Sequence, residues 1–429
     1  MVERMFGVTA AGSTIEREVL GGATTFMTMA YILFVNGLIL SGAKLAPEQV
    51  LTVTALVAGV TTIAMGLAAN YPFALAPGMG INAAVAGSLV ATQGLTAAEA
   101  MGVIVAEGLA ITLLVVVGVR ERVLDAIPDS LKRAIGAGIG LFLAVIGFAN
   151  GGLVVPGTGT LTTLGDLHAT KTIVFLVGLA IALALTVRKV RGALMIAIAA
   201  ATVLAVGLGE TTAPKAFVAT PDFGLVGQFS FGFAGKLGVL GAALAVFSLM
   251  LSDFFDTVGT AIGLGEQGKF LDERGRLPRM KRVLLVDSLA AVAGGVASAS
   301  SATTYIESAA GIADGARTGL ASVVTGLLFL AAMFIGPLAG VVPGAAIASA
   351  LVVVGFLMAG MLRDIDWQDL PVAAPAFLCA IVMPVTWSIS NGIGAGVIAH
   401  ALLMTVAGRR VPVLVWGVAV AFALFFALA

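Results

Sequence analysis

The sequence predicts an all-α polytopic membrane protein. Its 429 residues are 59% hydrophobic and only 11% charged, whereas soluble domains carry about 25% charged residues. The charges are also unevenly placed, because long apolar runs are separated by short clusters that hold most of the lysines and arginines. This arrangement is typical of membrane-spanning segments and the loops between them.

A spanning helix needs about 20 predominantly apolar residues. Runs of this kind predict about 14 membrane segments, at residues 20–42, 48–69, 72–92, 97–119, 127–149, 171–187, 191–207, 238–265, 281–298, 300–314, 316–336, 342–361, 371–388 and 391–407. A further apolar run, 411–428, either crosses the membrane as well or lies against the bundle.

Loop charges orient this series of segments. Basic clusters, such as residues 188–191, 269–282 and 409–410, all follow even-numbered segments and therefore lie on one side. The positive-inside rule places that side, and with it the N-terminus, in the cytoplasm. The first 22 residues are polar and lack the apolar core of a signal peptide, so the first span is expected to direct insertion. We therefore expect a multi-pass protein of the cell (cytoplasmic) membrane.

Two predicted segments are unsuited to a regular helix. The third contains two prolines and two glycines within residues 72–80, and the tenth, 300–314, is short and rich in hydroxyl groups. Irregular backbone at membrane depth persists only where protein buries it or where it lines a wet cavity. The two segments are seven apart, so the second half is expected to be inverted relative to the first. Interrupted segments at matching positions indicate a transporter's binding site.

Charged side chains inside a span cost at least ~2.5–3.5 kcal/mol each at the helix centre, so each needs a reason. Asp253 and Asp256 lie three residues apart in the eighth segment and share roughly one helical face. Glu307 lies beside the break in the tenth segment, and Asn36 lies in the first. A carboxylate and a carboxamide match the in-plane donors and acceptors of a nitrogen heterocycle. The alternative is that these groups only tie helices together.

Aromatic residues near these polar groups offer a stacking face for such a ring. They are Phe73, Phe254, Phe255 and Tyr305.

For two other polar residues in the spans we expect a structural role and not a role in a site. Asp287, near the start of the ninth segment, is expected to pair with Lys281 or Arg282, and His400 is expected to be a packed or interfacial histidine. Glu107, in the fourth segment, has no predicted role.

Several classes of function are disfavoured. Lysines plus arginines equal aspartates plus glutamates, at 23 each, so there is no basic surface for nucleic acid. One cysteine, Cys379, excludes an internal disulfide and argues against a cysteine-based metal site. Two histidines, together with the lack of a nucleophile–base pair or cofactor motif, argue against a metal centre, a cofactor and an enzyme. The oligomeric state, a homodimer included, stays open.

The chain resembles the nucleobase-ascorbate transporter (xanthine/uracil permease) superfamily and, within it, the AzgA-like adenine/guanine/hypoxanthine permeases. The resemblance covers nearly the whole chain and is carried by residues 26–36, 69–80, 253–260 and 303–311. It implies two inverted repeats of seven segments, with short strands in the third and tenth. A core domain would comprise residues 1–126 and 238–341, and a gate domain residues 127–237 and 342–429.

The resemblance also implies a binding site. Asp256 and Glu307 match the acids that bind the base, and either is a candidate proton carrier because the family generally couples uptake to protons. Asn36 matches a polar residue of the site, and the strand backbone at 73–76 would face the ligand. The full expected set is Asn36, Phe73, Ala74, Leu75, Ala76, Asp253, Asp256, Tyr305, Ile306 and Glu307. Departures from the family pattern are Glu107, which has no counterpart, and the small Ala83-Ala84 pair.

The expected function is therefore proton-coupled import of purine bases by elevator-like movement of the core against the gate. The alternative is a permease of the same fold for uracil, xanthine or another small solute. An inorganic anion is disfavoured, because it would bind at a cation or at bare helix N-termini rather than beside two carboxylates.

Overall fold

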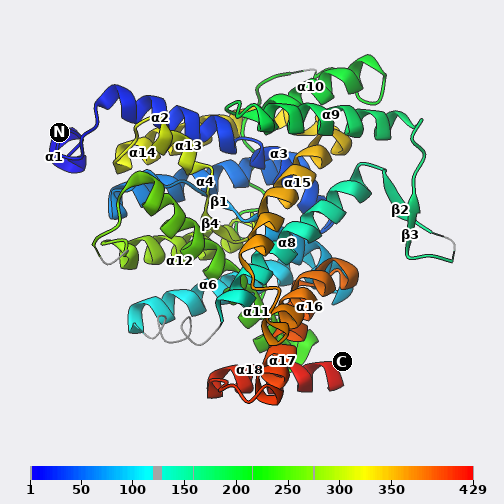
Figure 1. Cartoon of the computed structure of the whole chain (residues 1–429). Coiled ribbons are helices and arrows are strands. Elements are labelled where there is room, and N and C mark those ends of the chain that lie inside the picture. The colour runs from blue at the N-terminus through cyan, green and yellow to red at the C-terminus, as the bar shows by residue number, and fades with distance from the viewer. Residues whose placement is uncertain (1, 119–127, 158, 215, 274–275, 429) are drawn as a thin grey trace.

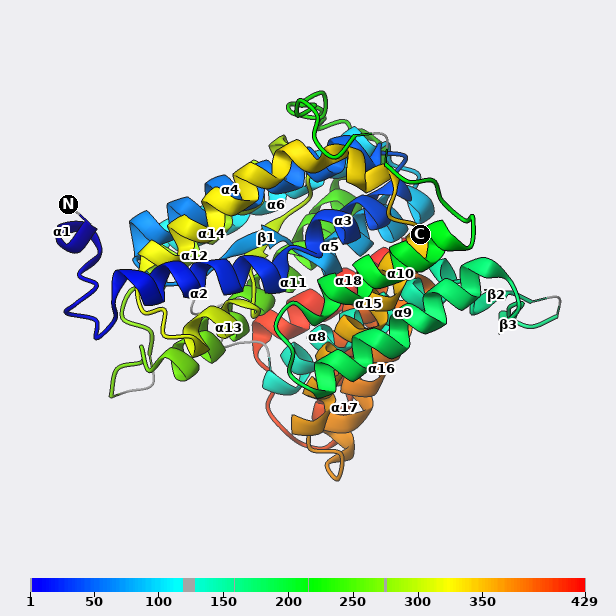
Figure 2. The same ribbon diagram turned by 90° about the horizontal axis from the view of Figure 1, so that it is seen from above.

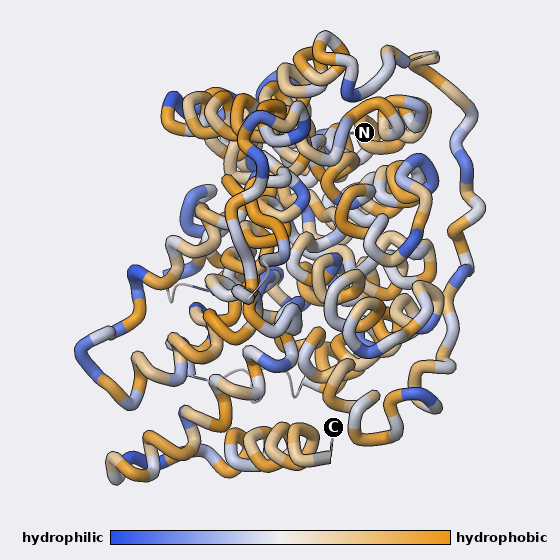
Figure 3. The backbone as a smooth tube through the Cα atoms, turned by 90° about the vertical axis from the view of Figure 1, so that its right-hand side faces the viewer, coloured by the Kyte–Doolittle hydropathy of each residue, from blue (hydrophilic) through white to orange (hydrophobic). Residues whose placement is uncertain are grey.

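The computed structural model describes residues 2–118, 128–157, 159–214, 216–273 and 276–428, and statements about structure refer to these (Figure 1). The predicted boundary between residues 126 and 127 and the side chain of Phe255 lie outside the described part. Among the described residues, nine helices are long and apolar enough to cross a membrane. Figure 3 shows apolar residues dominating these helices, so the prediction of an α-helical, multi-pass membrane protein is confirmed.

Helices occupy the predicted segments, with a short strand before them in the third and tenth and with more than one helix in several of the segments. The first half contains α1 (Val2–Phe6), α2 (Ile15–Met29), α3 (Ile32–Ser41), α4 (Pro47–Ala69), β1 (Leu75–Pro77), α5 (Met79–Ala83), η1 (Ala84–Thr92), α6 (Ala97–Val117), α8 (Asp129–Asn150), β2 (Val154–Pro156), β3 (Thr162–Leu164), α9 (Thr170–Val187) and α10 (Ala193–Gly207). The second half contains α11 (Phe233–Gly268), α12 (Met280–Val296), β4 (Ala302–Thr304), α13 (Ser308–Ala313), α14 (Gly319–Ala332), η2 (Met333–Gly340), α15 (Gly344–Ala359), η3 (Gly360–Asp364), α16 (Leu370–Thr386), α17 (Ile389–Val406) and α18 (Val413–Leu428).

The short strands predicted in the third and tenth segments are present. β1 and β4 pair antiparallel, with Leu75 opposite Thr304. Some backbone groups of the strands are not paired between β1 and β4 and bond to side chains instead. The Thr62 hydroxyl of α4 donates to the Leu75 carbonyl (3.0 Å) and accepts from the Leu75 N–H (2.9 Å). Ser308 likewise accepts from the Ala74 N–H (2.9 Å). The strands are thus stable inside the bundle, because their peptide groups are satisfied there without water.

The first segment differs from its prediction as one continuous span. It breaks between α2 and α3, where Leu33 and Phe34 donate to carbonyls three residues back rather than four. No proline or glycine lies between Ala23 and Val35, so the residue types give no sign of the break. Its consequence is to turn the wholly buried Tyr31 toward the tenth segment.

The helices form two packing groups. In the first, α14 packs on α4 and α2, α12 packs on α6 and α4, and α11 packs on α6. In the second, α15 packs on α8 and α9, α16 packs on α17 and α8, and α10 packs on α9. Figure 2 shows the two groups side by side, with β1 among the first.

Glycine pairs set the close helix contacts within each group. A Cβ at Gly319 of α14 would overlap the backbone of Gly66 in α4, and a Cβ at Gly355 of α15 would overlap the backbone of Gly140 in α8. Small residues that let helix backbones meet are the usual means of packing inside a membrane, where the lipid is as apolar as the side chains.

Two features lie outside the fourteen predicted segments. The β2–β3 hairpin, which the sequence did not predict, protrudes from one side of the molecule (Figure 1). The last apolar run forms α18, which packs against α17 and α11.

Candidate substrate site

A cavity of about 410 Å³ lies where the two packing groups meet. The start of α5, the end of β4 with the residues between β4 and α13, and one face of α11 form its walls on one side, and α15 with η3 forms the other. Asp256 and Glu307 both line it, as do Tyr305 and Ile306. The volume falls within the range of ligand pockets, about 300–1,000 Å³. The structure thus brings together four of the residues predicted for the site.

Glu307 is held in position by a tyrosine from the first segment. The carboxyl oxygen Oε1 accepts a hydrogen bond of 2.5 Å from the hydroxyl of Tyr31. Tyr31 is wholly buried at the break between α2 and α3, so this donor has a fixed position. Glu307 itself lies between β4 and α13 and lines the cavity.

Asp256 lies across the cavity on α11. It is half-buried, and no hydrogen bond from the described residues reaches its carboxyl group. It also lines a smaller cavity of about 70 Å³ with Ser252 and with Lys132 of α8, whose ammonium lies 2.8 Å from Asp129. A half-buried carboxyl without a protein donor is available to a ligand, since a buried acceptor is costly to leave unpaired.

The strand ends between these acids are fixed by their own hydrogen bonds. The hydroxyl of Tyr305 donates to the Pro77 carbonyl (2.6 Å), and its N–H donates to Ala74 (2.9 Å). The Gly78 N–H donates to Ser301 (2.8 Å). A Cβ at Gly80 of α5 would overlap the side chain of Ile139 in α8, so the glycine lets α5 approach the second packing group closely.

Asp287 corrects an expectation from the sequence. It is buried, at 1% exposure, beneath β4 rather than engaged at the outer end of its helix. Its Oδ1 accepts from the N–H and the hydroxyl of Thr304 (3.0 Å each), and Oδ2 accepts from Thr257 of α11 (2.6 Å). Lys281 and Arg282 are six and five residues away, whereas helical neighbours are three or four apart. That spacing could have indicated an inward-facing carboxylate.

Other residues of the predicted set lie behind the cavity. Asn36 is wholly buried, donates to Thr54 (2.8 Å) and to the Ala299 carbonyl (3.0 Å), and accepts from Asn82 (2.7 Å). It therefore joins the first, second and third segments to the chain just before β4. Phe73 stacks on a neighbouring ring rather than facing the cavity, with 5.1 Å between its centroid and that of Tyr71.

The rest of the predicted set is also buried away from the cavity. Residues 74–76 are at most 1% exposed and lie within the β1 region. Asp253 is fully buried on α11, where it faces Glu107 of α6. Five residues of the set thus support the cavity walls or lie next to them, and Asp253 belongs to a separate cluster.

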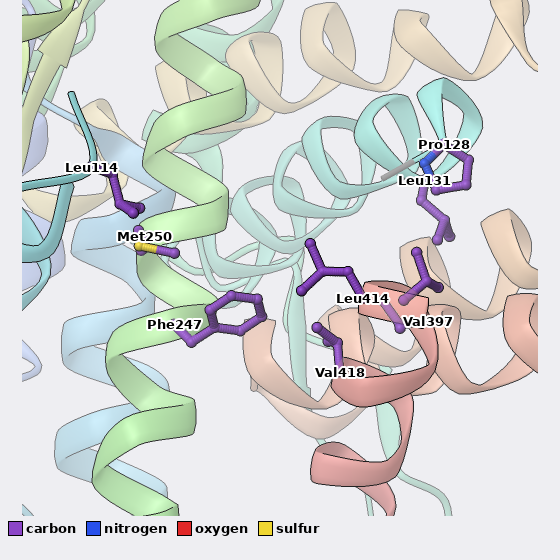
Figure 4. Close-up of a pocket in the computed structure, with 9 residues that line it drawn as sticks. Leu114, Pro128, Leu131, Phe247, Met250, Val397, Leu414 and Val418 are labelled. Atoms are coloured by element: carbon purple, nitrogen blue, oxygen red, sulfur yellow. The ribbon is translucent and has the colours of Figure 1, made fainter. Parts of the chain in front are cut away.

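A second pocket, of about 200 Å³, differs in chemistry. It lies between α6, α8, α11, α17 and α18 and is lined by apolar side chains such as Leu114, Phe247 and Leu414 (Figure 4). It offers no donor or acceptor side chain to fix a polar solute. The cavity with Asp256 and Glu307 is therefore the candidate site.

Comparisons with known proteins agree with this architecture. Residues 16–395 match the model of a family described as the Permease family. The chain is 40% identical over 416 residues to the adenine permease AdeP of Escherichia coli, covering 95% of this chain and 92% of that one. It is 40% identical over 411 residues to the guanine/hypoxanthine permease PbuO of Bacillus subtilis, covering 94% and 95%.

Among solved structures, the fold resembles the transmembrane domain of the cyanobacterial bicarbonate transporter BicA. The TM-score is 0.67 at 16% identity, and the match covers 89% of this chain and 97% of that domain. An identity this low shows the fold alone. The family match and the long, full-length similarity to AdeP and PbuO show more: the chain belongs to the Permease family, as an AzgA-like member of the nucleobase-ascorbate transporter superfamily, and is a membrane transporter rather than an enzyme.

Proposed function

We propose that this protein imports purine nucleobases (adenine, guanine or hypoxanthine) across the cell membrane, with its N-terminus in the cytoplasm. The observation that carries the proposal is the cavity in which Asp256 and Glu307 face one space between the ends of β1 and β4. The names of the relatives AdeP and PbuO, an adenine and a guanine/hypoxanthine permease, support the same substrate class.

The chemistry of the walls suits a flat, hydrogen-bonding ring. The two carboxyl groups can each accept from ring or exocyclic N–H groups in the plane of a purine. Leu357, Met358 and Met361 of the second packing group give apolar surface for the ring faces. An inorganic anion such as bicarbonate would instead meet two carboxylates, so the resemblance in fold to BicA does not extend to its substrate.

The position of the cavity supports an alternating-access mechanism. One wall comes from α5, α11 and the residues that follow β1 and β4, on the side of the first packing group, and the other comes from α15 and η3, in the second. We assign the first group to a core (residues 1–126 and 238–341) and the second to a gate (127–237 and 342–429). Movement of the core past α15 would carry the base across. Uptake is driven by proton symport, for which Asp256 and Glu307 are the candidate carriers within the site.

The test is uptake of radiolabelled adenine, guanine, hypoxanthine, xanthine and uracil by cells that lack their own purine transport. Purine accumulation that a protonophore abolishes is the expected result. If none of adenine, guanine and hypoxanthine is taken up or competes, the substrate assignment fails. Uptake of uracil or xanthine alone would show that this base, and not the proposed purines, is the substrate. Purine uptake that ignores both protonophore and external pH would refute symport while leaving the substrate class intact.

A further inference from the structure

A pair of acids that contact each other lies in the membrane part of the chain, outside the cavity. Glu107 of α6 and Asp253 of α11 are each fully buried, at 0% exposure, and their carboxyl groups contact each other. None of their four carboxyl oxygens accepts a hydrogen bond from an N–H or O–H group of the described residues. Within the described part of the chain, the pair therefore has no protein donor and no exposure to solvent.

Two ionised carboxylates are not stable in such a place. A buried charge without a partner is costly, and two like charges in contact repel in a medium of low dielectric. One shared proton removes the repulsion between the two carboxylates and gives the remaining charge a hydrogen-bond donor. The protonated acid donates its O–H to the other carboxylate, which forms a short, charge-assisted hydrogen bond. Binding converts one carboxylate to an acid and release reverses this, so no other bond is made or broken.

The charged groups that act on the pair are themselves acids. The carboxyl group of Asp287 on α12 disfavours a negative charge on both Glu107 and Asp253 by repulsion, and that of Asp256 does so for Asp253. The other Asp, Glu, Lys, Arg and His side chains on the described helices packed against α6 and α11 are Asp129, Lys132 and Arg133 (α8), Lys281 and Arg282 (α12) and His400 (α17), and Glu307 directly precedes α13. On the two helices themselves, Glu99 at the start of α6 is 2.7 Å from Lys236 near the start of α11, and the exposed Glu266 lies near the end of α11.

The pair is joined to the cavity through one helix and one strand. Asp253 lies within one turn of Asp256, which lines the cavity. Thr257, on the next turn of α11, donates to Asp287, and Asp287 holds Thr304 at the cavity wall. A change of charge at the pair is therefore felt at the site, because only one helical turn and a buried hydrogen-bonded network separate the two.

We propose that Glu107 and Asp253 form a proton-binding site of their own, separate from the acids that face the base, and that the shared proton is exchanged during the transport cycle. The coupling role rests on the proposed function as a proton symporter. The existence of the shared proton does not, because it follows from the geometry of the base-free protein.

The first test uses the full-length wild-type protein without substrate. Infrared spectroscopy, with glutamate or aspartate carboxyl groups isotope-labelled in turn, should show a protonated, strongly hydrogen-bonded carboxyl that titrates with pH. The signal should be lost in Glu107→Gln and Asp253→Asn and kept in Asp256→Asn. If no such carboxyl titrates in the wild type, or if Glu107→Gln leaves it unchanged, the proton site is refuted whether or not the protein transports purines.

The second test separates coupling from transport in proteoliposomes. In Glu107→Gln the amide can donate to Asp253 permanently, which imitates the protonated pair. We expect base-for-base exchange to persist while base-driven proton flux falls about tenfold or more, in the range typical of coupled sites. Ser248→Ala, which removes a fully buried hydroxyl without a partner on the same helix, is the matched control and should keep its flux.

An exchange of the two acids guards against a purely structural role. The double variant Glu107→Asp/Asp253→Glu keeps two carboxyl groups in the same space and should restore proton flux. Full coupling in Glu107→Gln would overturn the coupling role. Wild-type protein that carries no purine would instead overturn the proposed function, and the infrared titration would still decide the proton site.

Discussion

The hydrogen bond between Tyr31 and Glu307 makes the strongest quantitative test of the proposed substrate site. In Glu307→Gln the amide oxygen can still accept from the Tyr31 hydroxyl, which lies 2.5 Å from Oε1 in the wild type, so the side chain should keep its orientation. What is lost is the charge, together with one acceptor that the amide replaces by a donor. A hydrogen bond to a charged group contributes about 1.5–3 kcal/mol, which corresponds to about 10- to 150-fold in the dissociation constant of the base.

Tyr31→Phe tests the same interaction from the other side. Phenylalanine fills the same wholly buried space, so no cavity is left, and only the donor that fixes Glu307 disappears. The base must then immobilise the carboxyl group itself, at about 0.5–1.5 kcal/mol, or about 2- to 12-fold in affinity. In the double variant Tyr31→Phe/Glu307→Gln the loss of binding free energy should be smaller than the sum of the two single losses, because both changes act on one carboxyl group.

The assay is equilibrium binding of a radiolabelled purine to purified protein, with thermal unfolding followed in parallel to confirm that each variant folds. Glu266→Gln is the matched control, since Glu266 is exposed on α11 and should leave affinity unchanged. Wild-type affinity in Glu307→Gln would remove Glu307 from the site. A larger loss in Tyr31→Phe than in Glu307→Gln would show that Tyr31 does not act by holding that carboxyl group.

Two further predictions concern the frame around the site. Gly319→Ala should destabilise the protein by about 1–3 kcal/mol, because the new methyl group overlaps the backbone of Gly66; Gly417→Ala, which meets open space, should unfold at the wild-type temperature in the same thermal scan. Thr62→Val should cost about 1–3 kcal/mol by leaving the Leu75 N–H buried without its partner; it should also weaken base binding, and unchanged stability and binding would show that water takes the place of the hydroxyl.

The sequence predicts the framework well because membrane spans have a strong compositional signal. A run of about 20 apolar residues is long enough to cross the hydrocarbon core as a helix, and two prolines with two glycines in residues 72–80 are unsuited to a regular helix. The breaks in the third and tenth segments therefore follow from residue types alone. The antiparallel pairing of Leu75 with Thr304 is a different matter, because nothing in either segment specifies its partner.

The features that the sequence did not reveal depend on three-dimensional contacts. The break at Tyr31 lies in an apolar run without proline or glycine, and the residue that it places Tyr31 against, Glu307, is 276 positions away in the sequence. Glu107 and Asp253 lie 146 residues apart, and each alone looks like an isolated acid in a span. Their contact exists because α11 packs on α6, which no periodicity in either helix predicts.

The five acids of this region differ chiefly in how many donors surround them and whether they face a cavity. Asp287 accepts three hydrogen bonds from threonines and lines neither cavity, so it is suited to fixing β4. Asp256 and Glu307 face the cavity. Among the described residues Asp256 has no donor and Glu307 has one, the Tyr31 hydroxyl, so a base can complete their hydrogen bonds. In the part of the chain that the structure describes, Glu107 and Asp253 have no donor and line neither of these cavities, so a proton is the smallest addition that gives them a hydrogen bond. One cluster of like residue types can thus divide structure, substrate binding and proton binding between its members, because each carboxyl group is completed by a different partner.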